Sequence, residues 1–109
     1  MALFRELDNQ RGVSAVRHQI GIVYQERGDY AVALEQYEAS KQIQAEIKDR
    51  AGLARSLHSI GVIQQRLGKT ELAMENYLAA LEIDEALGNR EGIASLLHYI
   101  GTIHRGRGE

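Results

Sequence analysis

Apolar residues in the first part of the chain are separated by three or four positions, as on one face of an α-helix. A first run consists of Val13, Val16, Ile20 and Val23, and a second run of Ala33, Leu34, Tyr37, Ile43 and Ile47. Between the runs stands Gly28, which can end a helix in the left-handed conformation, followed by Asp29, a suitable N-cap. The pattern therefore predicts two helices joined as a hairpin.

The same pattern returns along the chain with a period of about forty residues. In the first helix the recurring positions are Gly12, His18, Gly21 and Gly28, then Gly52, His58, Gly61 and Gly68, then Gly92, His98, Gly101 and Gly108. In the second helix Ala33, Tyr37 and Ile43 recur as Ala73, Tyr77 and Ile83. With further turns expected at Asp49 and Asn89, we predict helices over residues 12–27, 30–48, 52–67, 70–87 and 92–107, and a leading helical fragment over 2–8.

A repeat of this kind predicts an all-α array that forms a single domain over residues 1–109. Its register assigns residues 1–11 to the end of a preceding second helix, 12–51 and 52–91 to two complete repeats, and 92–109 to the first helix of a third. Both ends of the chain then lie inside a repeat, so we expect an excerpt of a longer solenoid with apolar side chains exposed at its ends. These are Leu3, Phe4 and Leu7 at one end, and Leu96, Leu97, Ile100 and Ile103 at the other.

These positions resemble the tetratricopeptide repeat. Its first helix carries an apolar residue followed by glycine, and its second helix carries a small residue, an aromatic residue and another small residue at fixed spacing. The matching residues are Ile20, Gly21, Tyr24, Gly28, Ala33, Tyr37 and Ser40 in one unit, and Ile60, Gly61, Gly68, Ala73, Tyr77 and Ala80 in the next. The family's tryptophan and closing proline are absent, and the unit has the length of the family's longer variants. The resemblance implies a right-handed α-solenoid of antiparallel helical hairpins whose first helices line a concave, peptide-binding groove.

Composition limits the classes of function that fit this array. Hydrophobic residues make up 44% and charged residues 26%, with a net charge of -2, which is typical of a globular protein rather than of a disordered or strongly basic chain. The absence of cysteine excludes disulfides and thiolate metal sites. No apolar run is long enough to span a membrane, and Arg5 and Glu6 interrupt the apolar start of the chain. We therefore expect a cytoplasmic protein with no membrane or nucleic-acid partner.

Three histidines, His18, His58 and His98, hold the same position in successive units and should form a ladder on adjacent first helices. Neighbouring helices pack about 8–10 Å apart, whereas zinc needs its ligand atoms at about 2.0–2.1 Å. One ion cannot collect the ladder, so we expect groove-lining or half-buried histidines and no metal or other cofactor. No Ser–His–acid group and no separate carboxylate pair stands apart from the repeat, so we do not expect an enzyme.

Charge divides between the two kinds of helix, because the first helices carry mostly arginine and the second helices mostly aspartate and glutamate. By the resemblance, the residues that line the groove are His18, Gln19, Ile22, Gln25, Arg55, His58, Ser59, Val62, Gln65, Arg66, His98, Tyr99, Thr102 and Arg105. Such a groove is polar, mildly basic and dotted with apolar spots, which suits a peptide with acidic groups. The alternative is a plain solvated surface. The side chains with which chaperone-binding members hold a peptide C-terminus are missing from the corresponding positions.

We therefore predict a protein–protein interaction module that binds a partner peptide or protein segment of acidic character in the groove of the first helices. The alternative is self-association or a role as a structural scaffold. In that case the uncapped ends of the solenoid make the contacts, and the chain forms homo-oligomers.

Overall fold

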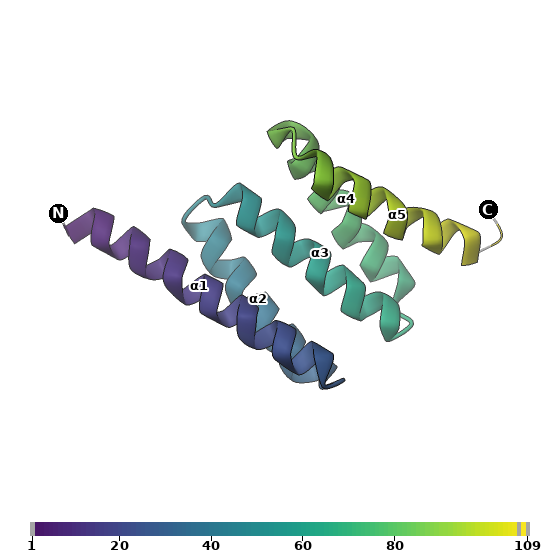
Figure 1. The fold of residues 1–109 in the computed structure, drawn as a ribbon, viewed down its shortest axis with the longest axis horizontal. Helices are drawn as coiled ribbons and strands as arrows, with labels where there is room; N and C mark the ends of the chain where they lie inside the picture. The colour runs from purple at the N-terminus through teal and green to yellow at the C-terminus, as the bar shows by residue number, and fades with distance from the viewer. Residues whose placement is uncertain (1, 107, 109) are drawn as a thin grey trace.

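The chain folds into five α-helices, each packed antiparallel against the next. The computed structural model describes residues 2–106 and 108, with side chains from residue 6 onward. The helices are α1 (Ala2–Glu26), α2 (Tyr30–Glu46), α3 (Arg50–Arg66), α4 (Thr70–Leu87) and α5 (Arg90–Gly106). In Figure 1, α1, α3 and α5 form one layer and α2 and α4 lie behind them. The all-α array of helical hairpins that the repeat predicts is confirmed for the described residues.

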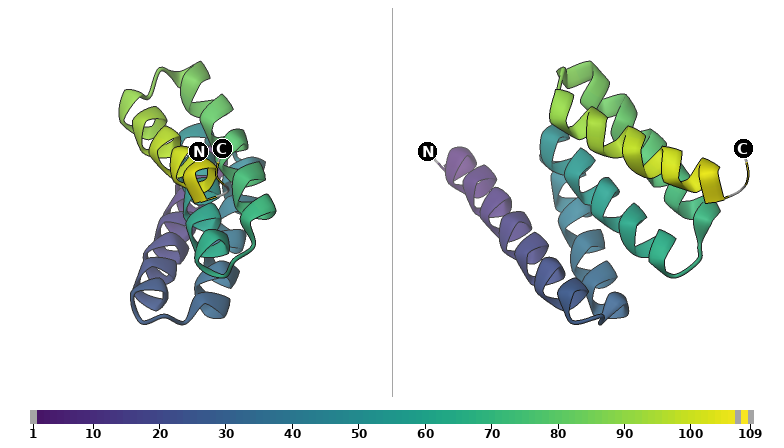
Figure 2. Two further views of the ribbon diagram at one scale, coloured as in Figure 1. Left: turned by 90° about the vertical axis from the view of Figure 1, so that its right-hand side faces the viewer. Right: turned by 45° about the vertical axis from the view of Figure 1, so that its right-hand side comes forward.

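Two further views show the same succession of helices from α1 to α5 (Figure 2). The molecule measures 55 × 32 × 18 Å, so it is elongated and thin. An array of this shape leaves a large share of its first helices open to solvent.

Each helix is followed by a turn that uses one residue with positive φ. These residues recur every twenty positions, with φ between 60° and 82°: Gly28, Lys48, Gly68, Gly88 and Gly108. After the first four of them, the next amide bonds back to the carbonyl five residues earlier, as in Asp29 N to Tyr24 O (2.9 Å) and Lys69 N to Gln64 O (2.8 Å). This hydrogen bond satisfies a carbonyl that the end of a helix otherwise leaves unpaired.

The two aspartates at predicted turns behave differently. The Asp49 side chain caps α3 by accepting a hydrogen bond of 3.1 Å from Gly52 N. Asp29 occupies the N-cap position of α2, as predicted, but its side chain makes no cap hydrogen bond. Its side chain is exposed, and solvent can satisfy the first amides of α2 instead.

The first and second helices cross most closely where a glycine faces a tyrosine. A Cβ atom added to Gly21 would lie 2.6 Å from Tyr37 Cε1, and one added to Gly61 would lie 2.6 Å from Tyr77 Cε1. Both tyrosine side chains are fully buried. Only glycine leaves room for the ring at this crossing, because the surrounding core is close-packed.

The core consists of two clusters that share α3. The first contains Ala33, Tyr37, Ile60 and Ile63, from α2 and α3. The second contains Ala54, Leu57, Ala73, Tyr77, Ala80, Ile83, Leu96 and Ile103, from α3, α4 and α5. α3 is therefore enclosed on two sides, whereas α1 packs mainly on α2 and α5 mainly on α4.

The turn expected between residues 8 and 12 is absent, because α1 runs without interruption from Ala2 to Glu26. Residues 6–13 are exposed apart from the half-buried Gln10, so no packing holds this segment in a turn. Continuing the helix satisfies the backbone hydrogen bonds locally. The separate fragment over 2–8 is thus wrong, and residues 2–11 belong to α1 rather than to the end of a preceding second helix. The side chains of Leu3 and Phe4 lie outside the described residues.

The exposed apolar end predicted for the last helix is only partly correct. Leu97 is 53% exposed, but Leu96 and Ile103 are buried, with 0% and 4% exposed, and Ile100 is half-buried. Leu96 and Ile103 face α4, which precedes α5, and not the side on which a following helix would pack. The sequence pattern shows which residues are apolar but not which neighbour covers them.

Gly61→Ala and Gly101→Ala should have opposite effects on stability, although the two glycines hold the same repeat position. At Gly61 the new Cβ meets the buried Tyr77 ring, so we expect a loss of about 1–3 kcal/mol. At Gly101 nothing lies within 4 Å, so the higher helix propensity of alanine should add up to about 1 kcal/mol. Urea unfolding followed by circular dichroism measures both changes. Equal effects at the two positions would contradict the close crossing at Gly61.

Lys48→Gly should stabilise the protein, because Lys48 has a φ of 60° and is the only non-glycine residue at positive φ in the described chain. Glycine relieves a Cβ strain of about 1–2 kcal/mol but adds freedom to the unfolded chain, so we expect a net gain of up to about 1 kcal/mol. Gln42→Gly, inside α2, is the control and should destabilise by about 1 kcal/mol. The thermal midpoint should rise for the first variant and fall for the second.

Candidate functional site

α3 and α5 enclose a shallow hollow on the layer of first helices. Its volume is about 320 Å³, and its lining residues are Val62, Gln65 and Arg66 from α3 and His98, Tyr99 and Thr102 from α5. Figure 1 looks onto this layer, with α3 and α5 in front of α4. The spacings of three and four within each trio place its members on one helix face. All six residues belong to the groove predicted from the sequence.

Tyr77 of α4 supports the hollow from behind. Its ring is fully buried, and its hydroxyl donates a hydrogen bond of 2.8 Å to Gln65 Oε1. Burial, and then the neighbouring Tyr99, raise the pKa of the Tyr77 hydroxyl, so this group stays a protonated donor. The bond occupies the side-chain oxygen of Gln65 and leaves its amide N–H groups for another acceptor.

Tyr99, which lines the hollow, belongs to a group of three packed rings. The Tyr77 and Tyr99 rings are stacked with 5.5 Å between centroids, and the His58 ring packs edge-on against Tyr99 at 5.1 Å. Burial lowers the pKa of His58, although the carboxylate of Asp84 opposes the shift. His58 is therefore neutral at neutral pH, and it packs with the buried Tyr77 behind Tyr99, the ring of this group that lines the hollow.

Three arginines, Arg55, Arg66 and Arg105, are exposed on the first helices. Arg105 Nη2 donates a hydrogen bond of 3.3 Å to Thr102 Oγ1. In the part of the chain that the structure describes, the only salt bridge lies within α2, so Arg55 and Arg66 have no carboxylate partner there. Arg66 lines the hollow itself, where its guanidinium can meet an anionic group.

The first unit does not repeat this arrangement. His18 is buried, and its Nδ1 has no hydrogen-bond partner among the described residues. Its ring packs against Tyr37 with 5.0 Å between centroids. The Tyr37 hydroxyl donates a hydrogen bond of 2.7 Å to Gln25 Oε1, and the Tyr37 side chain also hydrogen-bonds with Ser59. These side chains hold α1, α2 and α3 together through their contacts with one another.

The predicted groove residues of α1 therefore do not join the hollow. Ile22 is half-buried against the cluster around Tyr37, and Gln19 lines a separate apolar hollow of α1. The structure brings six of the predicted residues of α3 and α5 together around the hollow, whereas Arg55, His58, Ser59 and Arg105 do not line it. The predicted residues of α1 serve mostly in packing. The three histidines of the ladder also differ in burial: His18 is buried, His58 is half-buried and His98 is exposed.

The described residues contain no group of three or more His, Asp or Glu side chains that could hold a metal ion. None of the helices in residues 2–106 is long and apolar enough to cross a membrane.

The family model of the tetratricopeptide repeat matches residues 12–86, more than half of the chain. The chain belongs to the tetratricopeptide repeat family. Repeats of this family are protein–protein interaction modules, so the coarse function predicted from the sequence is confirmed. No curated protein matches the chain.

These tetratricopeptide repeats also bury two polar side chains that the sequence reasoning missed. The Gln44 amide lies 2.6 Å from a serine hydroxyl of α3, and Asp84 accepts a hydrogen bond of 3.3 Å from the turn after α4. Only 1% and 5% of these two residues are exposed. The sequence contains a signal for these two buried polar residues, because Gln44 precedes the repeat glycine Gly52, and Asp84 precedes Gly92, by eight positions.

Lowering the pH from about 7 to 5 should destabilise the repeats partly through His18. Burial, reinforced by Arg55, holds the pKa of His18 below the ordinary value of 6.5. As the pH falls, His18 is therefore protonated in the unfolded chain before it is protonated in the folded chain. The stability that neutral His18 contributes is fully present above pH 6.5 and is lost as the pH falls from 6.5 through the folded-state pKa. His18→Gln should make the urea midpoint less dependent on pH. The same change at the exposed His98 is the control, and an unaltered pH profile in His18→Gln would contradict the assignment.

Proposed function

We propose that the hollow between α3 and α5 binds an acidic segment of a cytoplasmic partner protein. The observation that carries this proposal is the position of Arg66, which lines the hollow without a carboxylate partner among the described residues, next to the amide N–H groups of Gln65. A guanidinium and an amide side by side offer hydrogen-bond donors to a carboxylate.

The apolar part of the hollow fits the stem of such a side chain. Val62 and the Tyr99 ring lie beside the two donors, so the methylene groups of a glutamate can pack on them while its carboxylate meets Arg66. The protonated Tyr77 hydroxyl fixes the Gln65 side chain in place. Less side-chain freedom is then lost when a ligand binds, which favours affinity.

Local charge, rather than net charge, supports an acidic ligand. The chain carries a net charge of -2, so its overall charge does not attract an acidic peptide. The first helices nevertheless carry most of their charge as arginine, and the acidic residues are concentrated on α2 and α4, behind the layer seen in Figure 1. An acidic segment is therefore attracted to the layer of first helices.

Acidic peptides should bind more weakly when the arginines of this layer are reversed. The probe is a fluorescein-labelled peptide library rich in Glu and Asp, compared with a matched library in which Gln and Asn replace them. We expect Arg66→Glu with Arg105→Glu to weaken acidic peptides about tenfold or more, and added salt to weaken binding to the parent protein. Fluorescence anisotropy measures both.

The control is Arg50→Glu with Arg90→Glu, which makes the same charge change at the other ends of α3 and α5. Binding to this control should stay close to that of the parent. Equal binding of the neutral library, or equal weakening by the two double variants, would show that the hollow is not the site.

A further inference from the structure

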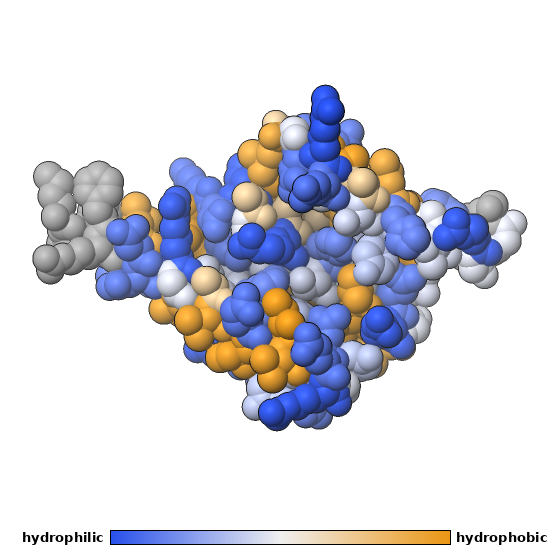
Figure 3. Space-filling model, in the orientation of Figure 1, coloured by the Kyte–Doolittle hydropathy of each residue, from blue (hydrophilic) through white to orange (hydrophobic). Residues whose placement is uncertain are grey.

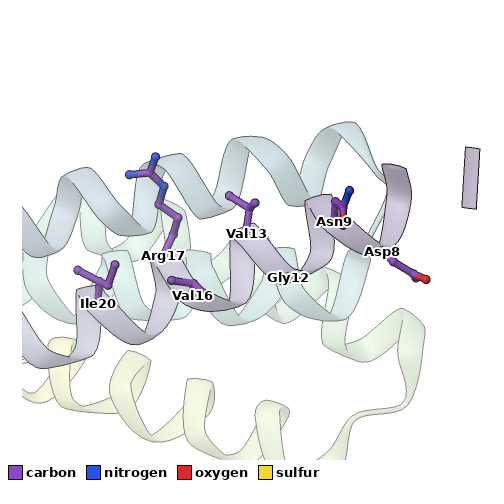
Figure 4. A pocket seen from close by; sticks show the side chains of 7 residues that line it. All are labelled: Asp8, Asn9, Gly12, Val13, Val16, Arg17 and Ile20. Carbon is purple, nitrogen blue, oxygen red and sulfur yellow. The ribbon is translucent and has the colours of Figure 1, made fainter. Parts of the chain in front are cut away.

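An apolar stripe lies open along α1, away from the hollow between α3 and α5. Val13, Val16 and Val23 are 44%, 59% and 46% exposed, and Ile20 lies between them. Apolar residues gather along α1 in the space-filling view (Figure 3). Two adjoining hollows follow the stripe, and the larger, of about 630 Å³, is lined by Asp8, Asn9, Gly12, Val13, Val16, Arg17 and Ile20 (Figure 4).

The same face is covered in the two other first helices. On α3 it includes Ile60 and Ile63, which pack against α2 and are 1% and 0% exposed. On α5 it includes Leu96 and Ile103, which pack against α4 and are 0% and 4% exposed. The chain thus shows twice that an antiparallel second helix covers this face, and α1 lacks such a helix among the described residues.

Gly12 is an independent sign that this face receives a side chain from another helix. A Cβ atom at Gly52 would lie 2.8 Å from Gln44 Nε2 of α2, and a Cβ atom at Gly92 would collide with the Asp84 carboxylate of α4. Gly12 holds the same repeat position, yet nothing lies within 4 Å of its Cβ site. Gly12 also lies in the interior of α1 rather than at its start. In a helix interior, glycine costs about 1 kcal/mol relative to alanine.

We propose that the stripe on α1 is a docking site for an amphipathic helix of a partner protein. The helix lies antiparallel to α1 and places a glutamine or aspartate over Gly12. Its chemistry follows from the two helices that cover the equivalent faces: Ala33, Tyr37, Ser40 and Gln44 in α2, and Ala73, Tyr77, Ala80 and Asp84 in α4. Small residues let the helices approach, the aromatic ring fills the space beside Ile20 and Val23, and the polar side chain enters the gap left by glycine.

A second copy of this chain does not supply such a helix. Its α2 is already enclosed between α1 and α3, and its α4 between α3 and α5. Its α1 carries valine and isoleucine on the open stripe but neither the tyrosine nor the long amide of the covering helices. A separate amphipathic helix therefore fits the face better than a second α1 does.

The test uses the chain of residues 1–109 and labelled peptides with the sequences of α2 (residues 30–46) and α4 (residues 70–87) as probes. We expect saturable binding in fluorescence anisotropy, with no binding of scrambled peptides. Val16→Glu and Gly12→Leu should each weaken binding at least tenfold, because the first puts a charge in the stripe and the second fills the gap. Since Gly12 touches nothing, Gly12→Leu should leave the thermal midpoint unchanged or higher, which separates lost binding from lost folding.

Two controls isolate the site. Leu78→Glu places the same charge at an exposed leucine of α4, outside the stripe, and should leave peptide binding unchanged. Arg66→Glu with Arg105→Glu should also leave it unchanged, so failure of the acidic groove and failure of this site are distinguishable.

Three outcomes would overturn the proposal. The first is no binding of either peptide, and the second is binding that Val16→Glu and Gly12→Leu leave unaltered, as expected if a peptide merely displaces α2 or α4 from the fold. The third is a dimer of the free chain in sedimentation velocity that Val16→Glu converts to monomer. That result would assign the stripe to a second copy of the chain.

Discussion

The close contact between a glycine of the first helix and a tyrosine of the second is the constraint on which the rest of this structure depends. Gly61 has no Cβ, so the Tyr77 ring can lie against the α3 backbone, and Gly21 and Tyr37 repeat this contact between α1 and α2. The contact sets how near the two helices of a hairpin lie. It also determines where the tyrosine hydroxyl emerges, and each hydroxyl meets a glutamine of the first helix.

That packing contact is coupled directly to the binding surface. Tyr77 is a core residue by burial, yet its ring stacks on Tyr99 and its hydroxyl holds Gln65, both of which line the hollow. The hollow therefore has a rigid support, unlike a surface built from long, unsupported side chains. In the first unit the corresponding ring faces a buried histidine and a serine, so the same contact produces packing there rather than a binding surface.

Every first helix in this array has two apolar faces, one for the second helix before it and one for the second helix after it. α3 has both faces covered, and it is the helix shared by the two core clusters. Among the described residues, the only second helix that packs on α1 is α2 and the only one that packs on α5 is α4. A stripe of valines is open on α1, and Gly101 of α5 faces open space. The two end helices thus differ, since α1 presents a stripe of valines and α5 presents Leu97 and an empty glycine position at Gly101.

The sequence by itself determined the helical class, the family and the turns after α1 to α4. Glycine, alanine and tyrosine recur every forty residues because the local geometry requires them: turns need a positive φ, and close helix crossings need small residues. The resemblance to the repeat family also indicated the six residues of α3 and α5 that line the hollow. Only the tertiary structure decided that α1 is unbroken, that His18 is buried and that Leu96 and Ile103 are covered. These outcomes depend on which neighbour packs against each face, and a repeat pattern is the same whether the neighbour is present or not.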